Sequence, residues 1–211
     1  MNLTLREWSA LASAALMLGG GTWYIVQILR KEITPVFAAW IVLGGTLCLS
    51  FATYWTNPAK SLVSNAANAA AAFEGLATLV VLAIQNMKSH EKISFSPFQK
   101  FCLKVSALIA ALWVTIVWGF HGTGFIPNVL TQLLMIIGYV VMVPRLWNAT
   151  KNTDSYVLWS CIGLSCLFGL YTAAVSGDKL AVLYASRGFI ASATIVCLMY
   201  RADRKYRLAT T

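Results

Sequence analysis

Charged side chains are scarce in this sequence. Only 11% of its 211 residues are charged and seven are acidic, whereas a soluble domain carries about 25% charged residues. Hydrophobic residues make up 59% of the chain, and the mean hydropathy is +0.71. The composition therefore excludes a water-soluble globule and indicates a protein that crosses a membrane several times.

Residue patterns typical of enzymes and metalloproteins are also lacking. No nucleotide-binding loop and no nucleophile paired with a base stand out, so we expect neither an enzyme nor a bound cofactor. Neither His90 nor His121 has a metal-ligand partner at a suitable spacing. His121 is interpreted as a solvated loop residue, with a gating or proton-transfer role as the alternative. Five cysteines without zinc spacing are interpreted as small packing residues: Cys48, Cys102, Cys161, Cys166 and Cys197.

Long apolar runs are what the sequence has in abundance. A helix needs about 20 residues to cross roughly 30 Å of hydrocarbon, and helices satisfy the backbone where water is excluded. Seven runs have about this length: 8–29, 35–55, 61–84, 101–120, 125–143, 156–175 and 180–200. The predicted fold class is an all-α membrane protein with seven transmembrane helices.

The net charge of +9 is distributed unevenly along the chain. Segments on one side of the seven spans together carry +8: 30–32, 88–104, 145–154 and 201–207. The opposite side carries +1, and the two charges inside spans, Glu74 and Arg187, cancel. Because basic loops favour the cytoplasm, we predict a protein of the plasma (inner) membrane with its N-terminus outside and its C-terminus cytoplasmic. Binding of anionic headgroups by these segments is a secondary interpretation.

Two parts of the chain repeat the same order of features. WIVLG at 40–44 matches WSCIG at 159–163, and each follows an aromatic helix end and a basic turn. FATYW at 51–55 and GLYTA at 169–173 then lead into a short outer loop and a third span. With one linker helix between them, the two units have the same orientation, which makes a parallel repeat. We predict a first repeat at 8–84, a linker helix at 101–120, a second repeat at 125–200 and a basic cytoplasmic tail at 201–211.

This layout resembles the PQ-loop superfamily, and the SWEET-type sugar transporters are closest in architecture. Pro144-Arg145 stands where that family has Pro-Gln, and the first half has Val26-Gln27 without a proline. The resemblance implies a transporter in which Pro144 is a hinge for alternating access, since proline kinks a helix. The alternative is that Pro144 simply ends its helix. Similarly, the glycines at 19–21 supply either flexibility or a close helix-packing surface.

A charge inside a span indicates a functional site. Each unpaired charge at the bilayer centre costs on the order of 3 kcal/mol, so Glu74 and Arg187 should face a cavity or the bundle interior. The repeat match sets Asn68 opposite Arg187, which resembles the paired asparagines that flank the substrate in SWEET-type transporters. A guanidinium favours a carboxylate or phosphate group. Glu74 is also a candidate for proton coupling, and a direct Glu74–Arg187 ion pair stays open.

Further polar and aromatic residues complete the predicted site. A shift of the repeat register by three residues substitutes Asn65 or Ala71 for Asn68, while hydrogen bonding between helices is the alternative role of the two asparagines. Tyr139 and Tyr184 are expected to line the cavity, and the outer tryptophans to anchor the helices at the interface. The predicted substrate-binding residues are Asn65, Asn68, Glu74, Tyr139, Tyr171, Tyr184 and Arg187.

We therefore expect a transporter, either a facilitator or proton-coupled, of a small polar or anionic metabolite such as a sugar, carboxylate or amino acid. The alternative is a non-transporting receptor or a subunit of a membrane assembly. A retinal photoreceptor is excluded because the only lysine of the last span, Lys179, lies at its outer mouth. The expected partners are a small-molecule substrate and the lipid bilayer, not nucleic acid, and a homo-oligomer stays open.

The charge distribution makes a testable prediction about topology. A reporter fused after Thr211 should be cytoplasmic, and one inserted at Gly122 should be outside, because the +8 side faces the cytoplasm. Paired enzyme and fluorescence reporters measure both positions. The opposite location at either site would overturn the orientation and the repeat derived from it.

Overall fold

Seven long helices build the fold. The computed structural model describes residues 3–55, 63, 65–88, 94–119 and 125–210, and these residues contain no β-strand. Each helix is long and apolar enough to cross a membrane, which confirms the predicted fold class. The helices are α1 (Leu5–Leu29), α2 (Phe37–Trp55), α3 (Ala66–Lys88), α4 (Pro97–Val114), the short π-helix η1 (Thr115–Gly119) after α4, α5 (Phe125–Asn148), α6 (Tyr156–Val175) and α7 (Lys179–Thr210).

Capping residues explain where two helices begin. The Thr4 hydroxyl accepts the Glu7 N–H at 3.3 Å, and Glu7 Oε2 accepts the Thr4 N–H at 2.8 Å, so α1 starts before the predicted residue 8. Ser96 and Gln99 form the same reciprocal pair at the start of α4. The predicted start of the third span at residue 61 lies outside the described residues, as do both histidines.

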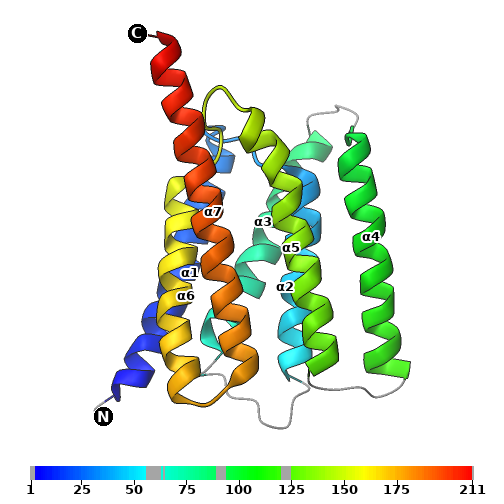
Figure 1. The fold of residues 1–211 in the computed structure, drawn as a ribbon, viewed down its shortest axis with the longest axis vertical. Coiled ribbons are helices and arrows are strands. Elements are labelled where there is room, and N and C mark those ends of the chain that lie inside the picture. The colour runs from blue at the N-terminus through cyan, green and yellow to red at the C-terminus, as the bar shows by residue number, and fades with distance from the viewer. Residues whose placement is uncertain (1–2, 56–62, 64, 89–93, 120–124, 211) are drawn as a thin grey trace.

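Three helices continue past their predicted ends, and α3 does so by one turn, to Lys88. α5 runs through Pro144 to Asn148, so the alternative that Pro144 ends the helix is wrong. α7 reaches Thr210, and most of the predicted tail is therefore a helical extension that projects beyond the other helices (Figure 1). Arg201 and Lys205 on this extension donate to the Trp147 carbonyl at the end of α5, at 3.0 and 3.4 Å.

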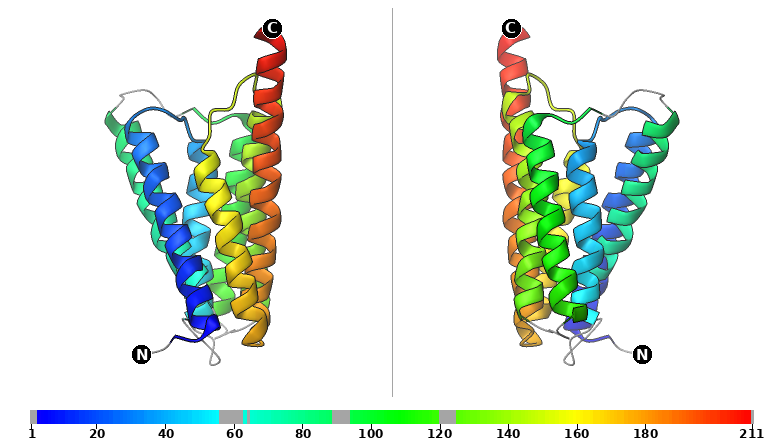
Figure 2. Two further views of the ribbon diagram at one scale, coloured as in Figure 1. Left: turned by 90° about the vertical axis from the view of Figure 1, so that its left-hand side faces the viewer. Right: turned by 90° about the vertical axis from the view of Figure 1, so that its right-hand side faces the viewer.

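Six of the helices, all except α4, pack around a common centre. α3 contacts α1 and α2, and α7 contacts α5 and α6. The two groups meet where α1 packs on α6 and α2 packs on α5. α4 packs mainly on α5 and lies at the edge of the bundle (Figure 1). Toward the end that carries the C-terminus, α1 and α3 incline away from α6 and α7 (Figure 2).

The contact between α1 and α6 is close and polar. Ser13 Oγ donates to the Ser165 carbonyl at 2.7 Å, and Ser165 Oγ donates to the Ser13 carbonyl at 2.7 Å. Farther along α1, a Cβ on Gly20 would lie only 2.6 Å from Cys161 Cβ. The glycines at 19–21 therefore include a helix-packing surface, as one of the two interpretations predicted. All five cysteines are free thiols.

The reciprocal serine pair makes a prediction about stability. Ser13→Ala and Ser165→Ala should each lower the free energy of unfolding by about 1 kcal/mol, because hydrogen bonds between membrane helices are worth roughly 0.6 and at most about 1.7 kcal/mol. The double variant should lose less than the sum, because the two hydroxyls also lie 3.0 Å apart and each single variant already removes this shared contact. Thermal unfolding in detergent measures this, with Thr194→Ala on the exposed face of α7 as control. Strict additivity would contradict a shared contact.

Candidate functional site: a charged cavity between six helices

A small cavity lies at the centre of the bundle. Its volume is about 30 Å³, which is room for one or two water molecules and not for a metabolite. Side chains therefore fill most of the centre of the bundle. All helices except α4 contribute to its wall: Met17, Trp40, Leu43, Leu47, Ala71, Glu74, Met135, Tyr139, Trp159, Ile162, Cys166, Tyr184, Arg187 and Gly188.

Glu74 supplies the negative charge of this cavity from α3. Its side chain is buried, and Oε1 accepts a hydrogen bond from the Thr78 hydroxyl, one turn along the helix, at 2.9 Å. Its stem lies against α1 at Gly21, where a Cβ would be 1.8 Å from Glu74 Cγ. Glycine at 21 is therefore what allows the carboxylate to lie between α1 and α3.

Arg187 supplies the positive charge from α7. Its Nε donates to Gln132 Oε1 on α5 at 2.5 Å, and its guanidinium lies over the rings of Tyr184 and Tyr139, at 5.1 and 5.7 Å from their centroids. Gln132 is held in turn, because its Nε2 donates to Asn128 Oδ1 at 3.3 Å. Arg187 Nη1 is buried and has no hydrogen-bond partner.

Glu74 and Arg187 line the same cavity without forming an ion pair. Among the residues that the structure describes, only Arg30 and Glu32 form an ion pair within 4.0 Å, and this pair lies on an exposed turn away from the cavity. The direct Glu74–Arg187 pair that the sequence left open is therefore not formed in this conformation. Each of the two opposite charges in this water-sized space therefore lacks an oppositely charged partner. Burying a charge without such a partner is energetically costly unless a further group binds there.

The structure brings together four of the seven predicted site residues. Glu74, Tyr139, Tyr184 and Arg187 line the cavity. Asn65, directly before α3, and Asn68, in its first turn, are buried outside the cavity wall. Asn65 Nδ2 and Asn68 Oδ1 have no hydrogen-bond partner among the residues that the structure describes. Tyr171 is 42% exposed on α6 and is not part of the wall.

Sequence reasoning missed Gln132 as a site residue. The signal was available, since an amide in the apolar run 125–143 should find a polar partner within the bundle for the same reason as Glu74. The tryptophans of the two matching motifs, Trp40 and Trp159, were used only to align the repeats, although both are buried and line the cavity.

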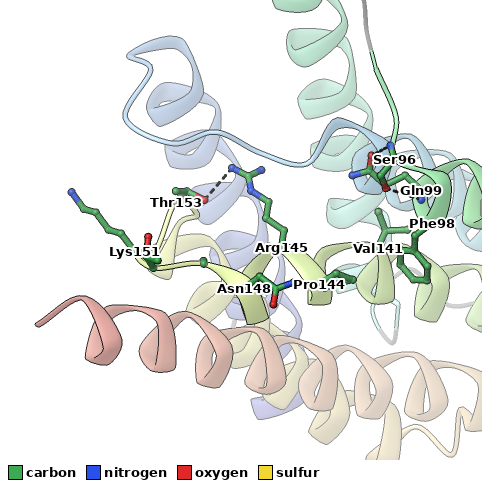
Figure 3. Close-up of a pocket in the computed structure, with 11 residues that line it drawn as sticks. Ser96, Phe98, Gln99, Val141, Pro144, Arg145, Asn148, Lys151 and Thr153 are labelled. Atoms are coloured by element: carbon green, nitrogen blue, oxygen red, sulfur yellow. Dashed lines mark hydrogen bonds between the residues drawn. The ribbon is translucent and has the colours of Figure 1, made fainter. Parts of the chain in front are cut away.

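Hydrogen bonds between two loops close the end of the bundle near the C-terminus. The Thr34 N–H donates to the Thr153 carbonyl at 3.1 Å. Arg145 Nη2, next to Pro144, donates to the hydroxyls of Thr34 and Thr153 at 2.5 and 3.0 Å, and Figure 3 shows the Arg145–Thr153 bond. A separate cavity of about 660 Å³ lies beside this contact, between α4, α5 and the loop at 149–153. The loop after α1 is therefore hydrogen-bonded to the loop after α5.

A second polar layer lies between these loops and the central cavity. Trp40 Nε1 donates to the Tyr24 hydroxyl at 3.1 Å, and Trp159 Nε1 donates to Asp154 Oδ1 at 3.3 Å. Burial raises the pKa of the Asp154 carboxyl, while bonds from the Ser155 N–H and the Trp159 indole oppose this shift. Both tryptophans thus have one side in the cavity wall and a ring nitrogen bonded in this layer.

The opposite end is closed by a contact between α2 and the turn before α7. The buried Tyr54 hydroxyl donates to Asp178 Oδ2 at 2.5 Å. The bond connects the end of α2 to the turn between α6 and α7. Polar contacts therefore connect the two helix groups at both ends of the bundle.

The close approach of Glu74 to α1 makes a prediction. Gly21→Ala should lower the free energy of unfolding by about 1–3 kcal/mol, because the added methyl overpacks the Glu74 stem. Gly19→Ala is the matched control: a Cβ there meets nothing within 4 Å, and alanine is the better helix former by about 1 kcal/mol. Thermal unfolding in detergent compares the two. Equal stability would contradict the packing of Glu74 against α1.

Comparison with protein-family models, with curated proteins and with solved structures found no match for this chain. What the cavity does therefore has to follow from its own charges, hydrogen bonds and closure.

Proposed function

We propose that this protein is a membrane transporter that moves a small polar or anionic metabolite through its centre by alternating access. The observation that carries the proposal is the pair of opposite charges, Glu74 and Arg187, that face one central cavity without pairing. Intramembrane charges of this kind typically mark substrate or ion pathways. A receptor or assembly subunit is expected to bury such groups in helix contacts instead.

The pattern of helix contacts supports the predicted parallel repeat. α3 between α1 and α2 corresponds to α7 between α5 and α6, and the α1–α6 contact corresponds to the α5–α2 contact. Thr34 and Thr153, which bond each other, are separated by the same 119 residues as Trp40 and Trp159. Parallel repeats of this kind are related by an axis along the membrane normal, and equivalent residues meet at such an axis. The resemblance to SWEET-type transporters belongs to this proposal.

In the proposed cycle, the polar contacts at the two ends open in turn. The inner contact is the Thr34–Thr153–Arg145 cluster, and the outer contact is Tyr54–Asp178. The closed structure corresponds to the intermediate in which both are formed. Pro144 precedes Arg145 in α5 and lacks a backbone donor, so it is the proposed hinge for opening the inner end. In a proton-coupled cycle the proton would bind Glu74, whereas a facilitator would leave it ionised.

The proposed orientation follows the positive-inside bias. The end with Arg145 and the extension of α7 faces the cytoplasm, and the end with Tyr54 and Asp178 faces outside. With this orientation, the Thr34–Thr153–Arg145 cluster is the inner contact and Tyr54–Asp178 is the outer contact.

An uptake experiment tests transport without knowledge of the substrate. Vesicles that contain the purified protein are incubated with a mixture of small polar metabolites, and their contents are identified by mass spectrometry. At least one compound should enter faster than into empty vesicles. Arg187→Ala should reduce its initial uptake at least tenfold, because a hydrogen bond to a charged group is worth about 1.5–3 kcal/mol and 1.4 kcal/mol is tenfold.

Two further variants sharpen this test. Arg187→Lys keeps the charge but loses the planar fork, so its uptake should lie between those of Arg187→Ala and the wild type. Arg204→Ala removes the same charge from the exposed extension of α7 and should change nothing. Equal uptake by folded wild type and Arg187→Ala, or no selective uptake by the wild type, would contradict the proposed transport.

A further inference from the structure

The unpaired charged groups in the central cavity indicate which chemical groups a ligand would need in order to bind there. Arg187 Nη1 is a buried donor without an acceptor in the part of the chain that the structure describes. On the other side, Glu74 has one oxygen bonded to Thr78 and no cationic partner within 4.0 Å among the described residues. The cavity therefore lacks an anionic group beside Arg187 and a cationic donor beside Glu74.

Resting on the proposed transport function, we infer that the substrate is a small zwitterion of the amino-acid class, with its carboxylate on Arg187 and its ammonium group on Glu74. The carboxylate matches the fork of the guanidinium, and the ammonium donates to the carboxylate of Glu74 in a charge-assisted hydrogen bond. One molecule then pairs with both charges, because Glu74 and Arg187 line the same small cavity.

Other substrate classes leave one charge uncompensated. A neutral sugar pairs with neither charge fully. A simple anion satisfies Arg187 and sets a second negative charge near Glu74, and a simple cation reverses the problem. A zwitterion also carries no net charge through the bilayer, so the loading of the site avoids the roughly 2.3 kcal/mol per 100 mV that a moving unit charge exchanges with the membrane potential.

The surroundings fix the two charges and leave the rest of the wall adaptable. Gln132 and the two tyrosine rings orient the guanidinium, while Thr78 and Gly21 hold the carboxylate. Met17 and Met135 line the same space. Methionine side chains are flexible and apolar, so they are suited to make room for a small substrate side chain when the cavity opens.

Three compounds of similar size separate the possibilities. Alanine carries both charged groups, propionate lacks the ammonium and ethylamine lacks the carboxylate. Titration of the purified protein with each is followed by tryptophan fluorescence, because Trp40 and Trp159 line the cavity. Alanine should bind at least tenfold more tightly than propionate or ethylamine. Glucose serves as the neutral comparison.

Charge-removing variants then assign the two ends of the substrate. Glu74→Gln should weaken the binding of alanine at least tenfold and should not weaken the binding of propionate. Arg187→Gln should weaken the binding of alanine to the same degree and should not weaken the binding of ethylamine. Glu32→Gln and Arg204→Gln remove the same charges outside the cavity and should change neither. The wild-type comparison stands by itself if a cavity variant does not fold.

Each contrary result has a distinct meaning. Propionate binding as tightly as alanine, with no effect of Glu74→Gln, would overturn the zwitterion and indicate an anion site. Binding of glucose alone, or of none of the twenty protein amino acids, would also overturn it. In these cases selective uptake from the metabolite mixture would still support transport. Loss of that uptake in folded protein would instead reject the proposed function itself.

Discussion

Two opposite charges lie in the interior of a bundle of membrane-spanning helices and do not neutralise each other. Most of the central packing depends on this constraint. A carboxylate or guanidinium at membrane depth must be kept from lipid and given polar partners. Here Gly21 makes space for the Glu74 stem, Thr78 bonds its oxygen, and Gln132 with two tyrosine rings holds Arg187. Helices from both groups contribute, so the site exists only when the groups are assembled.

The contacts that close the bundle are small compared with those that build it. At the end near the C-terminus two described hydrogen bonds connect the two helix groups, and at the opposite end Tyr54 bonds Asp178; each is worth about 0.5–1.5 kcal/mol net. The α1–α6 contact, by comparison, combines reciprocal serine bonds with close helix packing. The hydrogen bonds at the two ends therefore contribute only a few kcal/mol to holding the groups together, and the packing of α1 on α6 and of α2 on α5 supplies the rest.

The sequence predicted the helices well because hydropathy and length follow directly from bilayer thickness. Boundaries differed where local chemistry extended a helix, as at the Thr4 and Ser96 caps, and where Pro144 was accommodated inside α5. Glu74 and Arg187 could be chosen as site residues because a buried charge has few tolerable locations. Tyr171 could not be placed in the same way, since each residue turns a helix by about 100° and a tyrosine is stable on either side.

The absence of a Glu74–Arg187 pair could not be predicted from sequence either. It depends on side-chain directions and on the competing bond from Arg187 to Gln132, both of which arise only from packing. Asn68 shows the limit of the repeat alignment, which gives equivalent depth along two helices and leaves their rotation undefined. The asparagine is buried, yet it is not part of the cavity wall.

The extension of α7 has a mechanical consequence. Arg201 and Lys205 both donate to the Trp147 carbonyl in the last turn of α5, and the Arg201 guanidinium lies 3.6 Å from the centroid of the Trp147 ring. These bonds lie just beyond Pro144, so a bend there carries the base of the extension with it. From Arg201 to Thr210 the helix measures roughly 14 Å at 1.5 Å per residue. The position of the last turn of the chain therefore depends on the geometry of the end of α5, because the base of the extension is bonded there.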